Sequence, residues 1–247
     1  MEQTKSGTVR AVERALDILL CFTDEIDLGL TEIAEKTGLH KSTVFRLLAS
    51  LEVKGFVIRD SVTEKYRLGF RIWELSANLS QSDDPATILL PEMERLRDIL
   101  GETISLYIRD NNERIRIQAV QSKHSIRRVA PIGARLPLYV GASSKILIAF
   151  DNMDTQENMI KEWRELIDIS AYKDQIAEIR KVGYATSIEE REPGVAAVSV
   201  PIFNSSHQLV AALSVSGPVN RLTLENMKEH AGIMIETANR MGKMIRP

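Results

Sequence analysis

Three short runs near the start of the chain place apolar side chains at the spacing of a helix. They cover residues 9–22, 30–36 and 40–54, and each predicts an amphipathic helix that buries one stripe. In the first run the stripe consists of Val12, Ala15, Leu16, Leu19 and Leu20. Thr31 is the expected N-cap of the second helix and Gly38 its stop signal, which leaves only a tight turn before the third helix.

After the third helix the apolar pattern changes to the period of two that is typical of strands. Residues 56–59 and 66–68 alternate in this way on either side of a polar segment, so they predict a two-stranded hairpin. Residues 70–80 then return to helical spacing. Helix, helix, tight turn, helix and hairpin follow one another in the order of a winged helix-turn-helix.

The helix at residues 70–80 has an apolar stripe of its own. It is formed by Ile72, Leu75 and Leu79, with Trp73 beside them. Since a polar break follows, little of the first domain remains to cover this stripe, and we expect a second copy of the chain to cover it in a homodimer. The alternative is that the helix packs on its own chain.

The polar segment at residues 81–85 predicts a domain boundary. We expect a winged helix-turn-helix domain over residues 1–69, a linking helix and hinge over 70–84, and a second domain over 85–247. Helical patterns in the second domain cover residues 85–100, 143–150, 154–163, 174–182 and 223–244. Within the first of these, Pro91 indicates a kink or a restart of the helix. Strand patterns cover residues 103–109, 115–120, 124–131, 184–187, 195–203 and 209–215. Because helices segregate from antiparallel strands, the fold class is α+β.

The overall composition restricts the classes of function. The formal net charge of −2 does not indicate binding to nucleic acid or membrane. No apolar run approaches the length of a membrane span, and we expect no signal peptide. The single cysteine, Cys21, excludes an internal disulfide and a Cys-rich zinc site. We therefore expect a cytoplasmic protein that does not bind membranes.

Positive charge is concentrated locally, within the predicted winged helix. Residues 36–71 contain eight basic and three acidic side chains. The third helix presents Lys41, Ser42, Thr43 and Arg46, and the wing presents Lys65 and Arg67. Cations and hydroxyls of this kind bind phosphates and base edges. We expect these residues to bind double-stranded operator DNA; the alternative is a solvated face that binds another protein.

Motifs in both halves of the chain resemble one family. Residues 31–34, 41–48 and 65–69 resemble the DNA-binding half of IclR-type transcriptional regulators. The long C-terminal signature of that family matches Gly183, Ser187, Glu190, Ala197, Val198, Ser199, Ile202, Phe203 and Asn204, followed by residues 214–218. The resemblance covers nearly the whole chain, and its second motif is long enough to be specific.

This resemblance implies a GAF-like effector domain, an antiparallel sheet with helices on its faces, that holds a small organic or aromatic acid. The family's pocket maps to Leu136, Leu138, Tyr139, Gly141, Ala142, Ser187, Val195, Ala197, Ser214 and Ser216. Physical chemistry agrees, because N–H groups at the start of a helix at Gly141 and Ala142 bind carboxylates, and Ser214 and Ser216 share one strand face.

For several polar residues of this half the sequence leaves two interpretations open. Ser214 and Ser216 either face the pocket or are satisfied by neighbouring backbone. Glu190 and Arg191 either serve the pocket or lie in a solvated loop. Lys145 either steers an anion or is exposed.

We expect a regulator and not an enzyme. The sequence contains no GxxxxGK(S/T), HExxH, CxxC or GxSxG motif, and the four histidines show no ligand spacing, so we expect no cofactor and no metal. Our hypothesis is a homodimeric repressor, with pairing of dimers through the second domains, whose operator affinity responds to the acid through residues 70–80. The alternatives are an activator, and a regulator whose second domain binds a protein partner.

Overall fold

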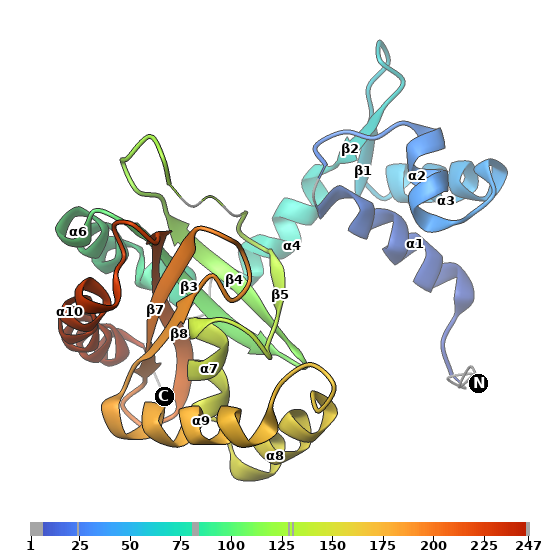
Figure 1. Ribbon diagram of the computed structural model, residues 1–247. Helices are drawn as coiled ribbons and strands as arrows, with labels where there is room; N and C mark the ends of the chain where they lie inside the picture. Colours follow the sequence, from blue (N-terminus) through green and yellow to red (C-terminus); the bar gives the residue numbers. More distant parts are fainter. Residues whose placement is uncertain (1–6, 24, 81–83, 128, 130, 246–247) are drawn as a thin grey trace. The chain divides into compact units, whose positions relative to one another are not determined.

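The computed structural model describes residues 7–23, 25–80, 84–127, 129 and 131–245, without the side chains of residues 78–80. The chain divides into two compact units, Met1–Ser82 and Asp83–Pro247 (Figure 1). Each unit has its own hydrophobic core.

The first unit is a winged helix-turn-helix, as predicted. Its elements are α1 (Arg10–Leu20), the short helix η1 (Cys21–Thr23), α2 (Leu30–Thr37), α3 (Lys41–Val53), β1 (Val57–Arg59), β2 (Tyr66–Leu68) and α4 (Phe70–Ser80). Strands β1 and β2 pair antiparallel as the wing. Gly38, with φ +66°, ends α2 in the left-handed region that glycine adopts without strain. Ile18, Ile33, Val44, Leu48 and Val57 form the centre of the core.

Two expectations about the first helices are wrong. Thr31 lies inside α2 and does not cap it, because the Glu32 carboxylate accepts a hydrogen bond from the Gly29 N–H and the helix begins at Leu30. On α1 the expected stripe is not the buried one. Val12, Leu16 and Leu20 are exposed, whereas Ile18 enters the core.

The second unit contains one six-stranded antiparallel sheet in the order β5-β4-β3-β8-β7-β6. Its strands are β3 (Thr103–Asp110), β4 (Glu113–Val120), β5 (Arg135–Pro137), β6 (Ala185–Ile188), β7 (Val195–Phe203) and β8 (Leu209–Pro218). The long central strands β3, β8 and β7 bring residues from both ends of the unit together. Ser105, for example, pairs with Ser214, and Ser214 pairs with Ser199.

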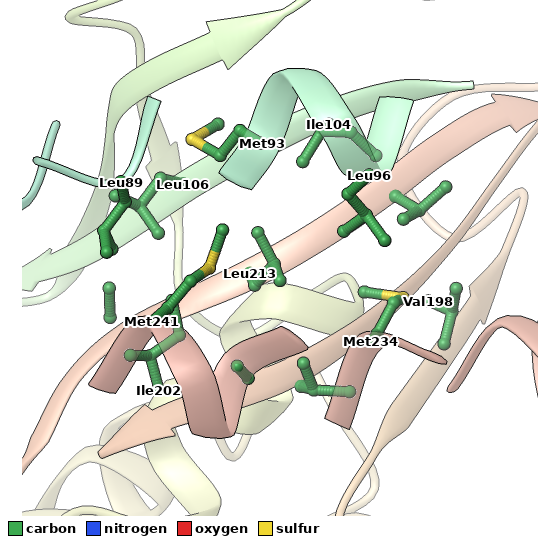
Figure 2. Close-up of a cluster of buried hydrophobic side chains, with 14 of the residues drawn as sticks. Leu89, Met93, Leu96, Ile104, Leu106, Val198, Ile202, Leu213, Met234 and Met241 are labelled. Atoms are coloured by element: carbon green, nitrogen blue, oxygen red, sulfur yellow. The ribbon is translucent and has the colours of Figure 1, made fainter. Parts of the chain in front are cut away.

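Helices cover both faces of this sheet (Figure 1). They are α5 (Pro85–Ile88), α6 (Leu90–Leu100), α7 (Ala142–Ala149), α8 (Met153–Glu162), α9 (Ile169–Val182) and α10 (Leu224–Met244). On one face, Met93 and Leu96 of α6 and Met234 of α10 pack with the central strands (Figure 2). Helices α7, α8 and α9 cover the other face. The α+β class is confirmed.

The helix expected at residues 85–100 restarts near Pro91, as the sequence indicated: it divides into α5 and α6 at Leu89, and Pro91 lies in the first turn of α6. Two other expected elements of the second unit differ in the structure. The described residues of 124–131 contain no strand, and the short strand lies later, at β5. Helix α9 begins earlier than expected, because the Asp168 side chain accepts hydrogen bonds from the backbone N–H groups of Ser170 and Ala171.

Candidate functional site

The outer face of α3 presents polar and cationic groups to solvent. Lys41, Ser42 and Arg46 are exposed and Thr43 is half-buried. Val44 and Leu48, on the opposite face, are fully buried and fix the helix to the core. The four polar residues predicted for DNA binding therefore lie together within the first turns of a rigidly held helix.

The cations around α3 fall into two groups. Lys36, Arg59, Lys65 and Arg71 each form an ion pair with a neighbouring carboxylate. Among the residues that the structure describes, Lys41, Lys54, Arg46 and Arg67 have no carboxylate within ion-pair distance. Since a cation without a protein partner gives up no ion pair when it binds a phosphate, this second group is the better suited to DNA.

The two wing residues differ in their surroundings. Nζ of Lys65 lies 2.9 Å from Oδ1 of Asp27, and this pairing raises the pKa of Lys65. Arg67 is exposed on β2. The structure thus leaves the guanidinium of Arg67 more available to a phosphate than the ammonium of Lys65.

Apolar side chains remain exposed on two helices of the first unit. On α4, Trp73 is 70% exposed and Leu75 is 53% exposed, whereas Ile72 is half-buried. The side chain of Leu79 lies outside the described residues. On α1, the exposed residues Val12, Leu16 and Leu20 follow a helical spacing. One chain therefore exposes an apolar face on each of two helices, α1 and α4. The sequence pattern had predicted that the residues on the α1 face would be buried in the core.

The second unit contains a cavity of about 50 Å³ between the start of α7, the central strands and the loop after β6. It brings together most of the residues that the sequence assigned to an effector site. These are Leu136, Gly141, Ala142, Ser187, Val195, Ala197, Ser214 and Ser216. Leu138 and Tyr139 do not line it: Leu138 is fully buried in the core, and the Tyr139 ring packs edge-on against Trp163.

Serine residues next to this cavity lie in line with one another across neighbouring strands of the sheet. Ser216 pairs with Ala197, and Ala197 pairs with Ser187 on β6. Oγ of Ser216 is buried and has no hydrogen-bond partner among the described residues. The interpretation in which backbone satisfies the strand serines therefore does not describe Ser216.

Basic and aromatic residues that the sequence patterns did not indicate also line the cavity. Tyr107, Arg114 and Arg191 are among them. Two guanidinium groups lie near the Tyr107 ring, with Cζ of Arg114 5.5 Å and Cζ of Arg116 5.3 Å from its centroid. One signal in the sequence was available: arginines at alternate positions of β4 point to one face of the strand, which is the face that the structure buries.

Buried Lys145 forms an ion pair with the partly exposed Glu190 at the start of α7. Nζ of Lys145 lies 2.5 Å from Oε1 of Glu190, and Oε2 of Glu190 accepts a hydrogen bond from the Gly141 N–H at 3.0 Å. Glu190 thus contacts the start of α7 although it lies in an exposed part of the loop, and Lys145 is buried and not exposed. Because Glu190 accepts a hydrogen bond from the Gly141 N–H, that N–H is not free for a ligand; Ala142 and Ser143 follow Gly141 in the cavity wall.

Two family descriptions match the chain. Residues 11–61 match the IclR helix-turn-helix domain, and residues 79–242 match the C-terminal domain of the bacterial transcriptional regulator IclR. No helix among the described residues combines the length and the apolar character that crossing a membrane requires.

Individual proteins match over nearly their whole length. The HTH-type transcriptional regulator KdgR of Escherichia coli is 30% identical over 94% of this chain and 91% of its own. The transcriptional repressor IclR of the same organism is 28% identical, and the match covers 94% of this chain and 89% of IclR. An IclR homologue of Microbacterium hydrocarbonoxydans, solved in complex with 4-hydroxybenzoate, has a TM-score of 0.78 and 25% identity, covering 93% of this chain and 99% of its own.

A winged helix-turn-helix joined to an α+β domain with a polar cavity defines a DNA-binding transcriptional regulator with an effector domain. It is a regulatory and not an enzymatic architecture. The chain belongs to the IclR family of transcriptional regulators.

Proposed function

We propose that this protein is a repressor that binds operator DNA through α3 and the wing and releases it, or binds it more tightly, when a small organic acid occupies the cavity of the second unit. The observation that carries the proposal is that one chain combines an exposed cationic helix face with a separate cavity lined by buried hydroxyl and guanidinium groups. The first suits a nucleic acid and the second a polar anion.

The DNA-contacting residues in this proposal are Lys41, Ser42, Thr43 and Arg46 of α3 and Lys65 and Arg67 of the wing. Lys41, Arg46 and Arg67 contribute free cations, and Ser42 and Thr43 contribute hydroxyls. Lys65 joins them only by exchanging Asp27 for a phosphate. Repression is the simpler outcome, because occupation of a promoter requires only tight binding, and the relative named above is a repressor.

A homodimer forms part of the proposal. The exposed apolar faces of α1 and α4 need a cover, and a second copy of the chain supplies one with the same faces. Two winged helices in one assembly read two half-sites, which gives the specificity that one alone lacks. Pairing of such dimers through the second units follows as the next level of assembly.

The acid acts on DNA affinity only if it binds two arrangements of the protein unequally. In the chain, helix α4 follows the wing and precedes the second unit, and it is the element through which we expect such a change to pass. The relative solved with 4-hydroxybenzoate supports a carboxylic acid as the effector class.

The experiment is a fluorescence-anisotropy titration of the purified protein against DNA from upstream of its own gene. It is run over a salt series, with and without a panel of small carboxylic acids. We expect specific, salt-sensitive binding that at least one acid shifts. Specific binding that no acid changes would favour a protein partner for the second unit, and absence of specific binding would contradict the DNA assignment. Transcription in vitro from the same promoter separates repression from activation.

A further inference from the structure

Phe45 is an aromatic residue on the solvent side of α3. Its side chain is 50% exposed, although the residue before it, Val44, is fully buried. An aromatic ring in water leaves unused the free energy that burial of its apolar surface would release. The exposed half of the Phe45 ring is therefore available to a binding partner of the first unit.

The neighbours of Phe45 on the helix show which surface it belongs to. Side chains four residues apart line up along an α-helix. One such row on α3 contains Ser42 and Arg46, and the next contains Lys41, Phe45 and Ala49. All five residues are exposed. The outer face of α3 thus carries two apolar side chains in a row next to hydroxyl and cationic groups.

The charges around these apolar side chains favour DNA over a protein partner. Among the described residues, Lys41 and Arg46 have no carboxylate within ion-pair distance. A protein surface that covered Phe45 would also bury these two cations, which is costly unless that surface supplied a carboxylate for each. The phosphates that border a groove of DNA supply the negative charge directly.

The major groove of DNA offers one apolar group that a phenylalanine can contact. This group is the C5-methyl of thymine, which the other three bases lack. An arginine in the same groove binds the O6 and N7 atoms of guanine. Base edges are contacted by the N-terminal residues of a recognition helix, and Phe45 and Arg46 both lie in the first half of α3. The two adjacent side chains are therefore suited to two different base pairs.

We propose that Phe45 determines part of the operator specificity by contacting thymine methyl groups in the major groove, and that the Ala49 methyl group extends this contact. Each half-site then contains a thymine close to the base pair that Arg46 contacts. The inference rests on the proposed function, because it states what one residue of α3 reads in the operator. The contact is apolar and releases no counterions, so its contribution does not depend on salt.

Replacement of thymine by uracil tests the inference, because it removes the methyl group and keeps the base pair. The fragment upstream of the gene is amplified with either thymidine or deoxyuridine triphosphate, and fluorescence anisotropy gives the Kd of the full chain for each form. One methyl group removed from water changes affinity by about fourfold. For two half-sites we expect the uracil form to bind about 10- to 20-fold more weakly, with the same ratio at each salt concentration.

Three variants assign the ratio to one side chain. Phe45→Ala should bind the thymine form more weakly and lose most of the difference between the two forms. Phe45→Leu keeps a large apolar side chain and should retain a difference of about threefold or more. Val62→Ala is the matched control, since Val62 is apolar and 89% exposed but lies in the turn of the wing, and it should leave the ratio unchanged. Circular dichroism and thermal unfolding check that the variants are folded.

Two results would overturn the inference and leave the proposed function intact. The first is equal affinity of the wild-type protein for the thymine and uracil forms. The second is a ratio that persists unchanged in Phe45→Ala, which would mean that another residue or the shape of the DNA accounts for it. Absence of specific binding to the thymine form would contradict the DNA assignment and this inference with it.

Single replacements of thymine by uracil then locate the contact. We expect one or two sensitive thymines in each half-site, and we expect Phe45→Ala to remove their effect. Sensitivity spread evenly over the fragment would contradict a contact made by one side chain.

Discussion

The guanidinium of Arg114 packs against the backbone of Gly141, where a β-carbon would lie 3.0 Å from Nη2 and 3.2 Å from Nη1. Gly141 has φ +97° and ψ 155°, a conformation that only glycine adopts without strain. The glycine thus permits the turn into α7 and makes room for the buried arginine. One residue links the start of a core helix to the charged wall of the cavity.

Gly141→Ala should therefore destabilise the protein by about 1–3 kcal/mol, because the β-carbon imposes backbone strain and displaces Arg114. Urea denaturation measures this change in the free energy of unfolding. Gly232→Ala is the matched control, since Gly232 lies within α10 with nothing within 4 Å of its β-carbon position. This control should be neutral or stabilise by up to about 1 kcal/mol. Equal effects of the two changes would contradict the role assigned to Gly141.

The ion pair between buried Lys145 and partly exposed Glu190 predicts a second stability effect. Lys145→Gln leaves the Glu190 carboxylate without its cation, and we expect a loss of about 2–3 kcal/mol, reduced from the fully buried case because Glu190 is partly exposed. Lys161→Gln is the comparison: its pair with Glu157 is solvent-exposed at 3.7 Å and should contribute less than about 0.5 kcal/mol. Urea unfolding of both variants distinguishes the two cases, and similar losses would mean that Lys145 contributes little.

A larger side chain at position 214 would fill the cavity and leave the DNA-binding unit unchanged. Ser214→Leu replaces a buried hydroxyl at the cavity wall with a larger apolar group. We expect the variant to lose the acid response while its affinity for operator DNA without acid changes by less than about twofold, at a stability cost of about 1–3 kcal/mol. Anisotropy titrations with and without the acid measure both quantities. Ser214→Ala is the smaller companion change, and a normal response in Ser214→Leu would place this serine outside the ligand site.

The sequence predicted the fold well because its signals are local. Period changes and stop residues such as Gly38 define the winged helix, and the pairing of β7 with β8 follows from the turn after Phe203. The boundaries that were wrong depend on side-chain caps, those of Glu32 on the Gly29 N–H and of Asp168 on the start of α9, which compete with other plausible caps nearby.

The ligand cavity was predicted only in part, for a physical reason. Strand serines and the Gly141 turn were marked by the family motif. Arg114 and Tyr107 meet them only through the pairing of β4 with β3 and of β3 with β8, which joins positions far apart in the chain. Likewise, the stripe on α1 was assigned to the core because a helical period shows which residues share a face but not which neighbour covers that face.

Arg46 is the residue by which the DNA assignment is tested. It is exposed on α3 and has no acidic partner among the described residues. Arg46→Ala should weaken operator binding by about 1–3 kcal/mol if the guanidinium contacts a base, or lower the salt slope by about one if it contacts a phosphate. Lys173→Ala removes one exposed charge from α9 and serves as the control. Unchanged operator affinity in Arg46→Ala would remove α3 as the recognition helix.

The exposed apolar faces of the first unit predict how the dimer can be broken. Leu75→Glu places a carboxylate where α4 should meet its partner, and burial of an unpaired charge should raise the dimer dissociation constant by about 100-fold or more. Leu16→Glu tests the α1 face in the same way. Leu166→Glu is the matched control, because Leu166 in the second unit is also exposed, at 60% against 53% for Leu75. Sedimentation velocity over a concentration series measures all three, and a wild-type profile for both Leu75→Glu and Leu16→Glu would show that the dimer forms elsewhere.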